Sequence, residues 1–596
     1  MKAVKIGLGL VVLSWSAVAT GQLGKPLVQT GDVVPGSAFD FDDFDAPVIN
    51  DAGAIAFSAT FLPGAGVTND NDTGVFIYRD QGATIEATFA AREGDALPGS
   101  DAIASGFHDI RLGSGQTLVM LTGSPNTGTA AVGGLWKFSG GPMGKLSMLI
   151  AFDQQVPGAS PMTYWGNVQR FRFVGDGALT FWSNLQGAGS MAQDAIGQVN
   201  VENGAASLLT RSGTTPIGTG SDLVKNLFSL GAAPTGEWAF PADISPNASA
   251  GFKALIVNNQ IAYKAGDFAP ATGKTFTGFE LPRMNDQADV LYFGRMGADR
   301  GLFVRSGTTD RTLTVEGEPA PNSGGTSFAS GSLALNRALI SSTGEVVVLA
   351  NLSGPNVTTT SDEAIYYYPA GSQSPAGKLV VREGDPAPGL AGVTFGRLYR
   401  TPQQVPNALI SIYNHGKVVF RAELAGDGIG NSNRDSLWKY DPVDGVISKI
   451  LQTGDALDVC GTPRTLEGFD IRLGSGVRDG ERSGVSDLGF IAVRAELSPP
   501  PGGSGTHSAL FVPNIDSPAL TPACSGGGNG SGGAGGAGAG GTGAGAGAGS
   551  AGKSSGGGSD GGGCSARRLD GGGQSGALAL LLAAGMWQRR RRSARA

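Results

Sequence analysis

The sequence predicts an all-β protein whose main body is an eight-bladed β-propeller of four-stranded blades, and three observations lead to this prediction. A turn of the form Gly-Asp/Glu-x-x-Pro-Gly recurs at intervals of about 60 residues. The stretches between turns are short, rich in β-branched and aromatic residues, and bounded by Gly, Pro, Asn and Asp. Between the two ends of the chain, no segment keeps the 3.6-residue hydrophobic period of an amphipathic helix.

The turn marks the repeat, with clear and degenerate copies. The clear copies begin at Gly31, Gly94, Gly266, Gly317, Gly384 and Gly454, and the degenerate ones at Asp153 and Gly213. Insertions in surface loops account for the variation in spacing. A β-solenoid also repeats strands, but its rungs are shorter than about 60 residues. The spacing therefore favours propeller blades.

Each repeat unit divides into four strands. The strand that enters the turn is short and apolar, as at 27–30, and a weaker segment around a Phe such as Phe279 follows the turn. A third, β-branched strand is exemplified by 346–349, and an aromatic or aliphatic fourth strand by 364–368. Four strands per unit is the composition of a propeller blade.

The phase of the repeat predicts how the ring closes. The first element, 27–30, is of the type that ends a unit, and the last, 509–512, is of the type that precedes it. We therefore expect 27–30 to complete the sheet that the C-terminal unit begins, within a propeller domain spanning 27–514. Seven blades with one aberrant unit, or two smaller propellers, are the alternatives.

Composition limits the classes of function. A hydrophobic content of 40% supports a core, and the net charge of −7, from 43 Lys and Arg against 50 Asp and Glu, argues against a nucleic-acid binder. The chain has only 3 His and 3 Cys, too few for most metal or catalytic centres built from these residues. We predict no catalytic residue and no cofactor.

The N-terminus has the pattern of a secretory signal peptide. A basic start, an apolar run over 6–18 and an Ala-x-Ala site at 17–19 predict a signal peptide at 1–19 that is cleaved after Ala19. The apolar run is shorter than the roughly 20 residues of a membrane span. Export is therefore expected.

The C-terminus has three parts. Residues 525–563 are almost entirely Gly, Ala and Ser, and such a segment is expected to be a disordered linker because it cannot bury enough surface to offset its ordering entropy. Cys564 follows, then an apolar run at 577–587, expected to form a short helix, and an arginine cluster at 589–592. We interpret 564–596 as a sorting or anchoring segment.

The order of Gly-rich spacer, Cys-Ser, short apolar helix and arginine cluster resembles the myxobacterial MYXO-CTERM surface-sorting tail. The resemblance implies recognition by a sorting protease, modification or lipidation at Cys564, and display on the outer surface of a Gram-negative bacterium, a myxobacterium. It also implies that only the C-terminal segment contacts the membrane. The alternative is an ordinary weak tail anchor.

The body, 27–514, resembles uncharacterised exported bacterial repeat proteins that carry sorting tails, through its EGDPAPG-like turn and short GLW-x-Y strand. This resemblance implies the fold and export but no activity. Since an exported chain enters an oxidising compartment, we expect Cys460 and Cys524 to form a disulfide near the seam of the ring. Two free thiols are the alternative.

Few residues qualify as a site. The recurring turn acids are expected to accept hydrogen bonds from local backbone N–H groups, with a ring of acidic ligands as the alternative: Asp32, Asp95, Asp267, Glu318, Asp385 and Asp455. Asp70 and Asp72 lie in a loop, 69–74, that weakly resembles a Ca²⁺ site but lacks the bidentate Glu of an EF-hand. The histidines, His108, His415 and His507, occur in different repeats.

These observations favour an exported, cell-surface β-propeller that binds a protein or a glycan, or serves as a scaffold. One alternative is an extracellular polysaccharide hydrolase or lyase with acidic residues at the propeller axis. The other is a structural protein of the envelope.

Overall fold

The computed structural model describes residues 23–517, except 65, 82–83, 99–102, 114–116, 123–132, 140–143, 176, 188–192, 214–221, 246–250, 331–337, 399–408, 475–482 and 506. All described residues belong to the first of two compact units, Met1–Gly528. The predicted signal peptide 1–19 with Ala19, the linker 525–563 and the segment 564–596 with Cys564 lie outside the described residues.

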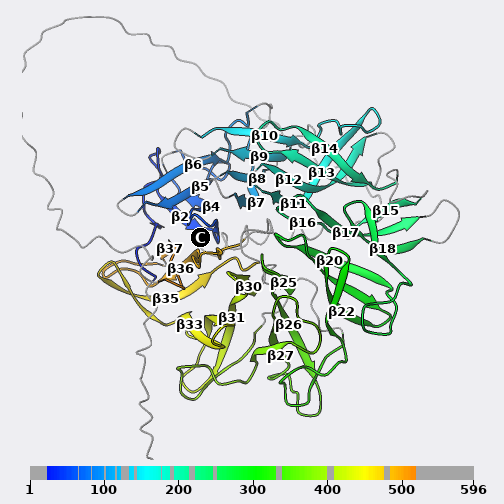
Figure 1. Ribbon diagram of the computed structural model, residues 1–596. Helices are drawn as coiled ribbons and strands as arrows, with labels where there is room; N and C mark the ends of the chain where they lie inside the picture. The colour runs from blue at the N-terminus through cyan, green and yellow to red at the C-terminus, as the bar shows by residue number, and fades with distance from the viewer. Residues whose placement is uncertain are drawn as a thin grey trace, which may run out of the picture. The chain divides into compact units, whose positions relative to one another are not determined.

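The described residues form eight antiparallel sheets, which follow one another around a ring as the blades of a β-propeller (Figure 1). We number the blades in chain order. Blades 1 to 4 contain β2 (Phe41–Phe44), β3 (Val48–Ile49), β4 (Ile55–Phe61), β5 (Thr73–Asp80) and β6 (Ile85–Arg92); β7 (Phe107–Leu112), β8 (Leu118–Thr122), β9 (Gly134–Phe138) and β10 (Leu146–Ala151); β11 (Thr163–Val174), β12 (Ala178–Gly187), β13 (Asp194–Asn200) and β14 (Ala206–Arg211); and β15 (Leu223–Leu227), β16 (Gly231–Ala232), β17 (Trp238–Ser245), β18 (Phe252–Val257) and β19 (Gln260–Lys264).

Blades 5 to 8 complete the ring, and blade 8 also takes up the first strand of the chain. They contain β20 (Gly278–Met284), β21 (Val290–Met296), β22 (Asp299–Ser306) and β23 (Thr309–Val315); β24 (Ser327–Phe328), β25 (Ala338–Ile340), β26 (Val346–Ser353), β27 (Glu363–Tyr368) and β28 (Lys378–Arg382); β29 (Val393–Phe395), β30 (Ile410–Tyr413), β31 (Lys417–Gly426), β32 (Asp435–Asp441) and β33 (Val446–Gln452); and β34 (Ala456–Val459), β35 (Thr462–Asp470), β36 (Val493–Leu497), β37 (His507–Phe511) and β1 (Val28–Gln29).

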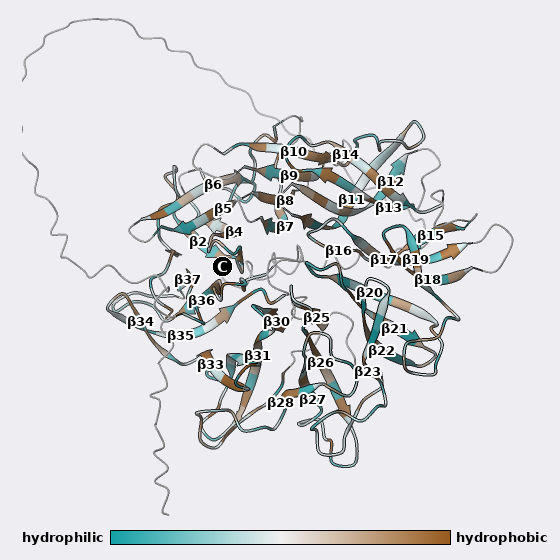
Figure 2. Cartoon of the chain, viewed as in Figure 1, coloured by the Kyte–Doolittle hydropathy of each residue, from teal (hydrophilic) through white to brown (hydrophobic). Residues whose placement is uncertain are grey.

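Each blade has four principal strands, and in blades 1 to 7 their chain order runs from the inner edge of the sheet to the outer edge. In blade 8 the outer strand is β1, and β34 is an additional strand that pairs with β35. In blades 1, 4, 6 and 7 the inner strand is broken into two short pieces that pair with the same neighbour, as β29 and β30 both pair with β31. The strands form because β-branched and aromatic side chains pack well on a pleated surface, and all six residues of β27 are buried. Figure 2 shows hydrophobic positions along strands such as β8 and β26.

The N-terminal strand closes the ring, as the phase of the repeat predicts. β1 pairs antiparallel with β37, with Val28 opposite Leu510, and the Leu27 N–H donates to the Leu510 carbonyl at 2.8 Å. Across the same seam, the Arg494 guanidinium in β36 binds the Asp43 carboxylate in β2 at 2.7 Å. A single ring of eight blades is thereby confirmed, and the alternatives of seven blades or two smaller propellers are wrong.

The core is distributed between blades rather than collected in one place. Eight hydrophobic clusters each combine residues of two consecutive blades, and together they form a closed circle of interfaces. At the seam, Val28 and Leu510 pack with Phe41 and Phe57 of blade 1. Because every blade buries both faces, no blade can fold stably without its neighbours.

Neighbouring blades are joined by the recurring turn. In six copies the turn glycine donates its N–H to the carbonyl of a buried residue at the inner edge of the next blade, at 2.7–2.9 Å, and that residue donates back to the carbonyl of the turn acid at 2.8–3.0 Å. At Gly31, for example, the partner is Phe41, which is fully buried. The six glycines have φ values from +83° to +98°, a conformation that residues with a Cβ rarely adopt.

The ring has two distinct faces. The joint face carries the recurring turns and the loops that connect the second strand of a blade, counted from the inner edge, to the third. Turn and loop are hydrogen-bonded to each other in blade 1, where Arg92 Nε donates to the Asn71 carbonyl at 2.9 Å. The hairpin face carries the turns between the first and second strands of each blade and those between the third and fourth strands. Arg311 links two such turns through the carbonyls of Gly344 and Ser372, both at 3.0 Å.

Replacing Val28 by Asp tests the closure. Val28 is 2% exposed, so V28D should lower the free energy of unfolding by about 3 kcal/mol or more, through lost burial and an unpaired buried charge. The matched control is V33D, because Val33 is 64% exposed and should tolerate the charge. Urea denaturation of both variants measures the difference. Equal stabilities would contradict the closing role of β1.

Candidate functional site

The recurring turn acids serve the backbone of their own turns. Asp32, Asp267, Asp385 and Asp455 each accept a hydrogen bond at Oδ2 from the backbone N–H three residues earlier, at 2.7–2.9 Å. Since these carboxylates are committed to the turns that join blades, the expected structural role is confirmed for these four residues. The alternative, in which these acids form a ring of ligands, is not supported for these four residues, because their carboxylates bind the backbone of their own turns.

The residue before the turn glycine has a second recurring role, which the sequence patterns did not reveal. Its side chain accepts a hydrogen bond from a backbone N–H at the start of the neighbouring strand, and this holds across different side chains: Thr30 from Ser508, Ser212 from Asp194, Glu316 from Arg300 and Thr453 from Asp435, at 2.8–3.2 Å. Only the shared position, not the residue type, identifies this contact. Because the residue type changes from copy to copy, no sequence motif predicts this contact.

Blade 6 contains two buried carboxyl groups, those of Glu383, which precedes the turn glycine, and of Glu363, which begins β27. Glu363 is 8% exposed and Glu383 is 4% exposed. Glu383 Oε2 accepts from the Asp362 N–H at 3.3 Å, and Glu363 Oε2 accepts from the Leu398 N–H of blade 7 at 2.7 Å. Burial, followed by the negative charges of Glu363 and Asp362, raises the pKa of Glu383 to about 7.

A carboxyl group that titrates near neutrality can act as a general acid or base. Here, however, Glu363 begins β27 and Glu383 follows β28, which are the third and fourth strands from the inner edge of blade 6. Both side chains are buried in the protein and bonded to backbone groups, one of them in the next blade. The pair therefore serves the packing of blades 6 and 7.

The Ca²⁺-like loop at 69–74 is organised by an asparagine rather than by its acids. Asn71 Oδ1 accepts from the Thr68 N–H at 2.8 Å, and Asn71 Nδ2 donates to the Gly66 carbonyl at 3.2 Å. Asn433 makes the same pair of contacts in the loop of blade 7, with Gly430 at 2.7 Å and Gly428 at 2.9 Å.

Asp70 and Asp72 flank this asparagine, and Asp72 Oδ1 accepts from the Thr73 hydroxyl at 3.1 Å. Across the described ranges of 23–517, no three His, Cys, Asp or Glu side chains come together as a metal site. The two aspartates thus belong to no such cluster, and an asparagine organises both this loop and the similar loop of blade 7.

The three histidines lie in three blades, His108 in β7, His507 in β37 and His415 in the turn between β30 and β31. The His415 turn has positive φ values at Asn414, His415 and Gly416, of 35°, 57° and 86°. These values are typical of a tight hairpin turn, which explains the position of His415. Because the three histidines lie in three different blades, they form no common site.

The hexapeptide that occurs twice, at 110–115 and 471–476, joins blades near their inner edge. The Arg111 guanidinium lies 4.8 Å from the ring centre of Phe171 in blade 3, and Arg472 Nε donates to the Ala46 carbonyl in blade 1 at 2.6 Å. The segments 331–337 and 399–408, between the two pieces of the inner strands of blades 6 and 7, and the segment 475–482, between β35 and β36, lie outside the described residues.

Cys460 lies in the turn between β34 and β35 and is disulfide-bonded. Cys524 and Cys564 both lie outside the described residues, so the pairing of Cys460 with Cys524 stays a prediction. No helix among the described segments is long and apolar enough to cross a membrane.

Replacing Asp385 tests the role of the turn acids. D385A leaves the Arg382 N–H without its 2.7 Å acceptor and should lower the free energy of unfolding by about 1 kcal/mol. D385N keeps an acceptor oxygen and should recover most of this loss, which urea denaturation would measure. Equal losses in the two variants would show that the carboxylate charge, not the hydrogen bond, matters.

Glu383 should make stability depend on pH. Because its pKa is raised in the folded protein, its contribution to stability is present at low pH and is lost as pH rises through about 7. E383Q cannot ionise, so its melting temperature relative to the wild type should rise between about pH 5 and about pH 9. The control is E202Q, at an exposed turn position, which should show no such trend. A constant difference for E383Q would refute the assignment.

Comparisons with solved structures give low scores. The chain is similar to the Dos1 propeller (9% identity, 82% of this chain, 96% of that chain, TM-score 0.37). It is also similar to the uncharacterised protein lmo1340 from Listeria monocytogenes EGD-e (9% identity, 59% and 86%, TM-score 0.29). A third is the α-L-arabinofuranosidase Arb93A from Fusarium graminearum (10% identity, 55% and 93%, TM-score 0.26). At these scores the likenesses carry no argument about function.

No curated protein matches the sequence. A family of unknown function, DUF7453, matches twice in tandem, over residues 27–257 and 252–513. The first match runs from β1 to β18 and the second from β18 to β37, so each spans about half of the ring. Because the two matches cover well over half of the sequence, the chain belongs to the DUF7453 family.

Proposed function

We propose that the protein is an exported propeller, displayed on the cell surface, that binds a protein or a glycan through its joint face. The observation that carries this proposal is the position of the chain exit. The Ile515 N–H donates to the Gly489 carbonyl at 2.8 Å, so the chain leaves the ring on the hairpin face. A tether attached there leaves the joint face free for a partner.

The joint face exposes apolar side chains in its recurring turns. Phe268 is 74% exposed and Val33 is 64% exposed, and both occupy the position directly after the turn acid. The next residue is buried in each case, Ala269 and Val34, so the turn itself is fixed while its tip projects. Aromatic side chains on a rigid support are common anchors in binding interfaces.

The ends of the sequence support the cellular part of the proposal. Cleavage after Ala19 releases the chain, and the segment 564–596 provides the features that a sorting protease would recognise, with Cys564 as the residue to be modified. The destination proposed is the outer surface of a Gram-negative bacterium, a myxobacterium.

Binding of the full-length protein to arrays of glycans and cell-surface proteins tests the proposal. F268D, on the joint face, should weaken the binding found by about tenfold or more, because a charge replaces an aromatic contact. V443D is the matched control, because Val443 is 92% exposed on the hairpin face. Absence of binding above background, or equal weakening by the two substitutions, would contradict the proposal.

A further inference from the structure

After β37 the chain does not leave the ring directly but crosses the hairpin face as a short segment, 513–517, which we call the exit segment. Its first contacts are with its own blade. The Ile491 N–H donates to the Pro513 carbonyl at 3.0 Å, and Asn514 Nδ2 donates to the Leu488 carbonyl at 2.9 Å. The exit segment thus lies against the turn that precedes β36.

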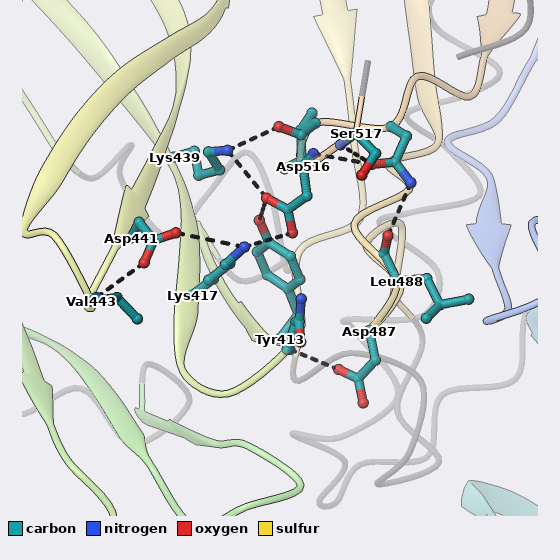
Figure 3. A network of polar contacts seen from close by, with 12 residues as sticks. Tyr413, Lys417, Lys439, Asp441, Val443, Asp487, Leu488, Asp516 and Ser517 are labelled. Atoms are coloured by element: carbon teal, nitrogen blue, oxygen red, sulfur yellow. Dashed lines mark hydrogen bonds and ion pairs between the residues drawn. The ribbon is translucent and has the colours of Figure 1, made fainter. Parts of the chain in front are cut away.

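Asn514 then turns the chain toward blade 7. Its Oδ1 accepts from the N–H groups of Asp516 and Ser517, at 3.0 and 2.7 Å. This turn brings the Asp516 side chain within reach of Lys417 and Lys439 of blade 7, as Figure 3 shows. A Cβ at Gly489, where φ is +80°, would come within 2.8 Å of Asp516 Oδ2, so the approach requires glycine.

Three side chains of blade 7 converge on the Asp516 carboxylate (Figure 3). Lys439 Nζ lies 3.1 Å from Oδ1 and also donates to the Ile515 carbonyl at 2.9 Å. Lys417 Nζ lies 3.1 Å from Oδ2, and the Tyr413 hydroxyl donates to Oδ1 at 3.3 Å. Blade 7 therefore holds both the side chain and the backbone of the exit segment.

These ion pairs are partly shielded from water. The side chains of Asp516, Lys417 and Lys439 are 12%, 21% and 20% exposed. Burial alone would raise the pKa of Asp516, but the hydrogen bonds and charges of the two lysines outweigh it and hold the pKa below its usual value. The carboxylate thus stays ionised, and its ion pairs are screened less by salt than pairs on the open surface.

We propose that the exit segment is a latch, in which Asp516 fastens the C-terminal end of the ring to Lys417 and Lys439 of blade 7. It opens and closes on an intact ring, because the contacts of Asp516 lie outside the strand pairings of blades 7 and 8, whereas Asn514 stays paired with Phe490 next to β36. In chain order the latch lies between β37 and everything beyond residue 517, so a pull on the C-terminus meets the latch before it meets β37. This inference does not depend on the proposed binding function.

Hydrogen exchange of the full-length protein, followed by mass spectrometry, tests the latch. D516N should speed exchange of the Ile515, Asp516 and Ser517 amides about tenfold, while the amides of β37 keep their wild-type rates. The matched control is D299N, which removes the partner of Lys274 in a more exposed pair of the same residue types on blade 5. D299N should leave the exit segment unchanged.

A second variant, K417M/K439M, removes the other half of the latch and keeps Asp516. It should reproduce the local acceleration that D516N causes. Unchanged exchange in either variant would overturn the proposal. Equal acceleration of the exit segment and of β37 would also overturn it, because the contacts would then be part of the ring's global stability rather than a separate latch.

A pulling experiment addresses the load directly. With force applied through the C-terminus of the full-length chain, the exit segment should detach from blade 7 at a lower force in D516N than in the wild type. In D299N it should detach at the wild-type force. Equal forces in all three proteins would overturn the claim that the latch carries load ahead of β37.

Discussion

Six of the eight joints of this ring depend on two backbone hydrogen bonds between the recurring turn and the inner edge of the next blade. The turn glycine donates forward and the buried residue of the next blade donates back, with nearly constant geometry in six copies. Because both bonds use main-chain groups, they tolerate a change of the partner from Phe41 to Ala104 or Leu466. The requirement is a glycine with positive φ, which is why this turn is the most visible repeat in the sequence.

Closure of the ring removes the two apolar blade faces that an open row of blades would expose. A blade buries both of its faces, so an open row of blades would leave two exposed apolar surfaces, and pairing of β1 with β37 removes them. The seam carries contacts that only distant segments can make, including Arg494 with Asp43 and the Asp487 N–H with Asp51 Oδ1 at 3.0 Å. The exit segment adds a further fastening beside this seam, between blades 8 and 7.

The hydrogen bonds at the joints also explain why the recurring turn acids are poor candidates for catalytic residues. Asp32, Asp267, Asp385 and Asp455 accept from N–H groups at the joints, and Glu383 accepts from the Asp362 N–H within blade 6. These acids recur because the turn recurs, and each of the four accepts a hydrogen bond within its own turn. Recognition is therefore expected from what differs between blades, namely the tips of turns and loops.

The sequence by itself determined the repeat, the strand types and the closing strand, because each follows from local periodicity and from the phase of one turn. It favoured eight blades over seven or over two smaller propellers, and the closed ring of the structure decided between them. The sequence also indicated the structural role of the turn acids, whose partners lie three residues away. Only the tertiary structure decided the contacts of Glu363 with Leu398 and of Asp516 with Lys417 and Lys439. These partners are far apart in the chain and share no motif, and the ring alone brings them together, so no local pattern could have paired them.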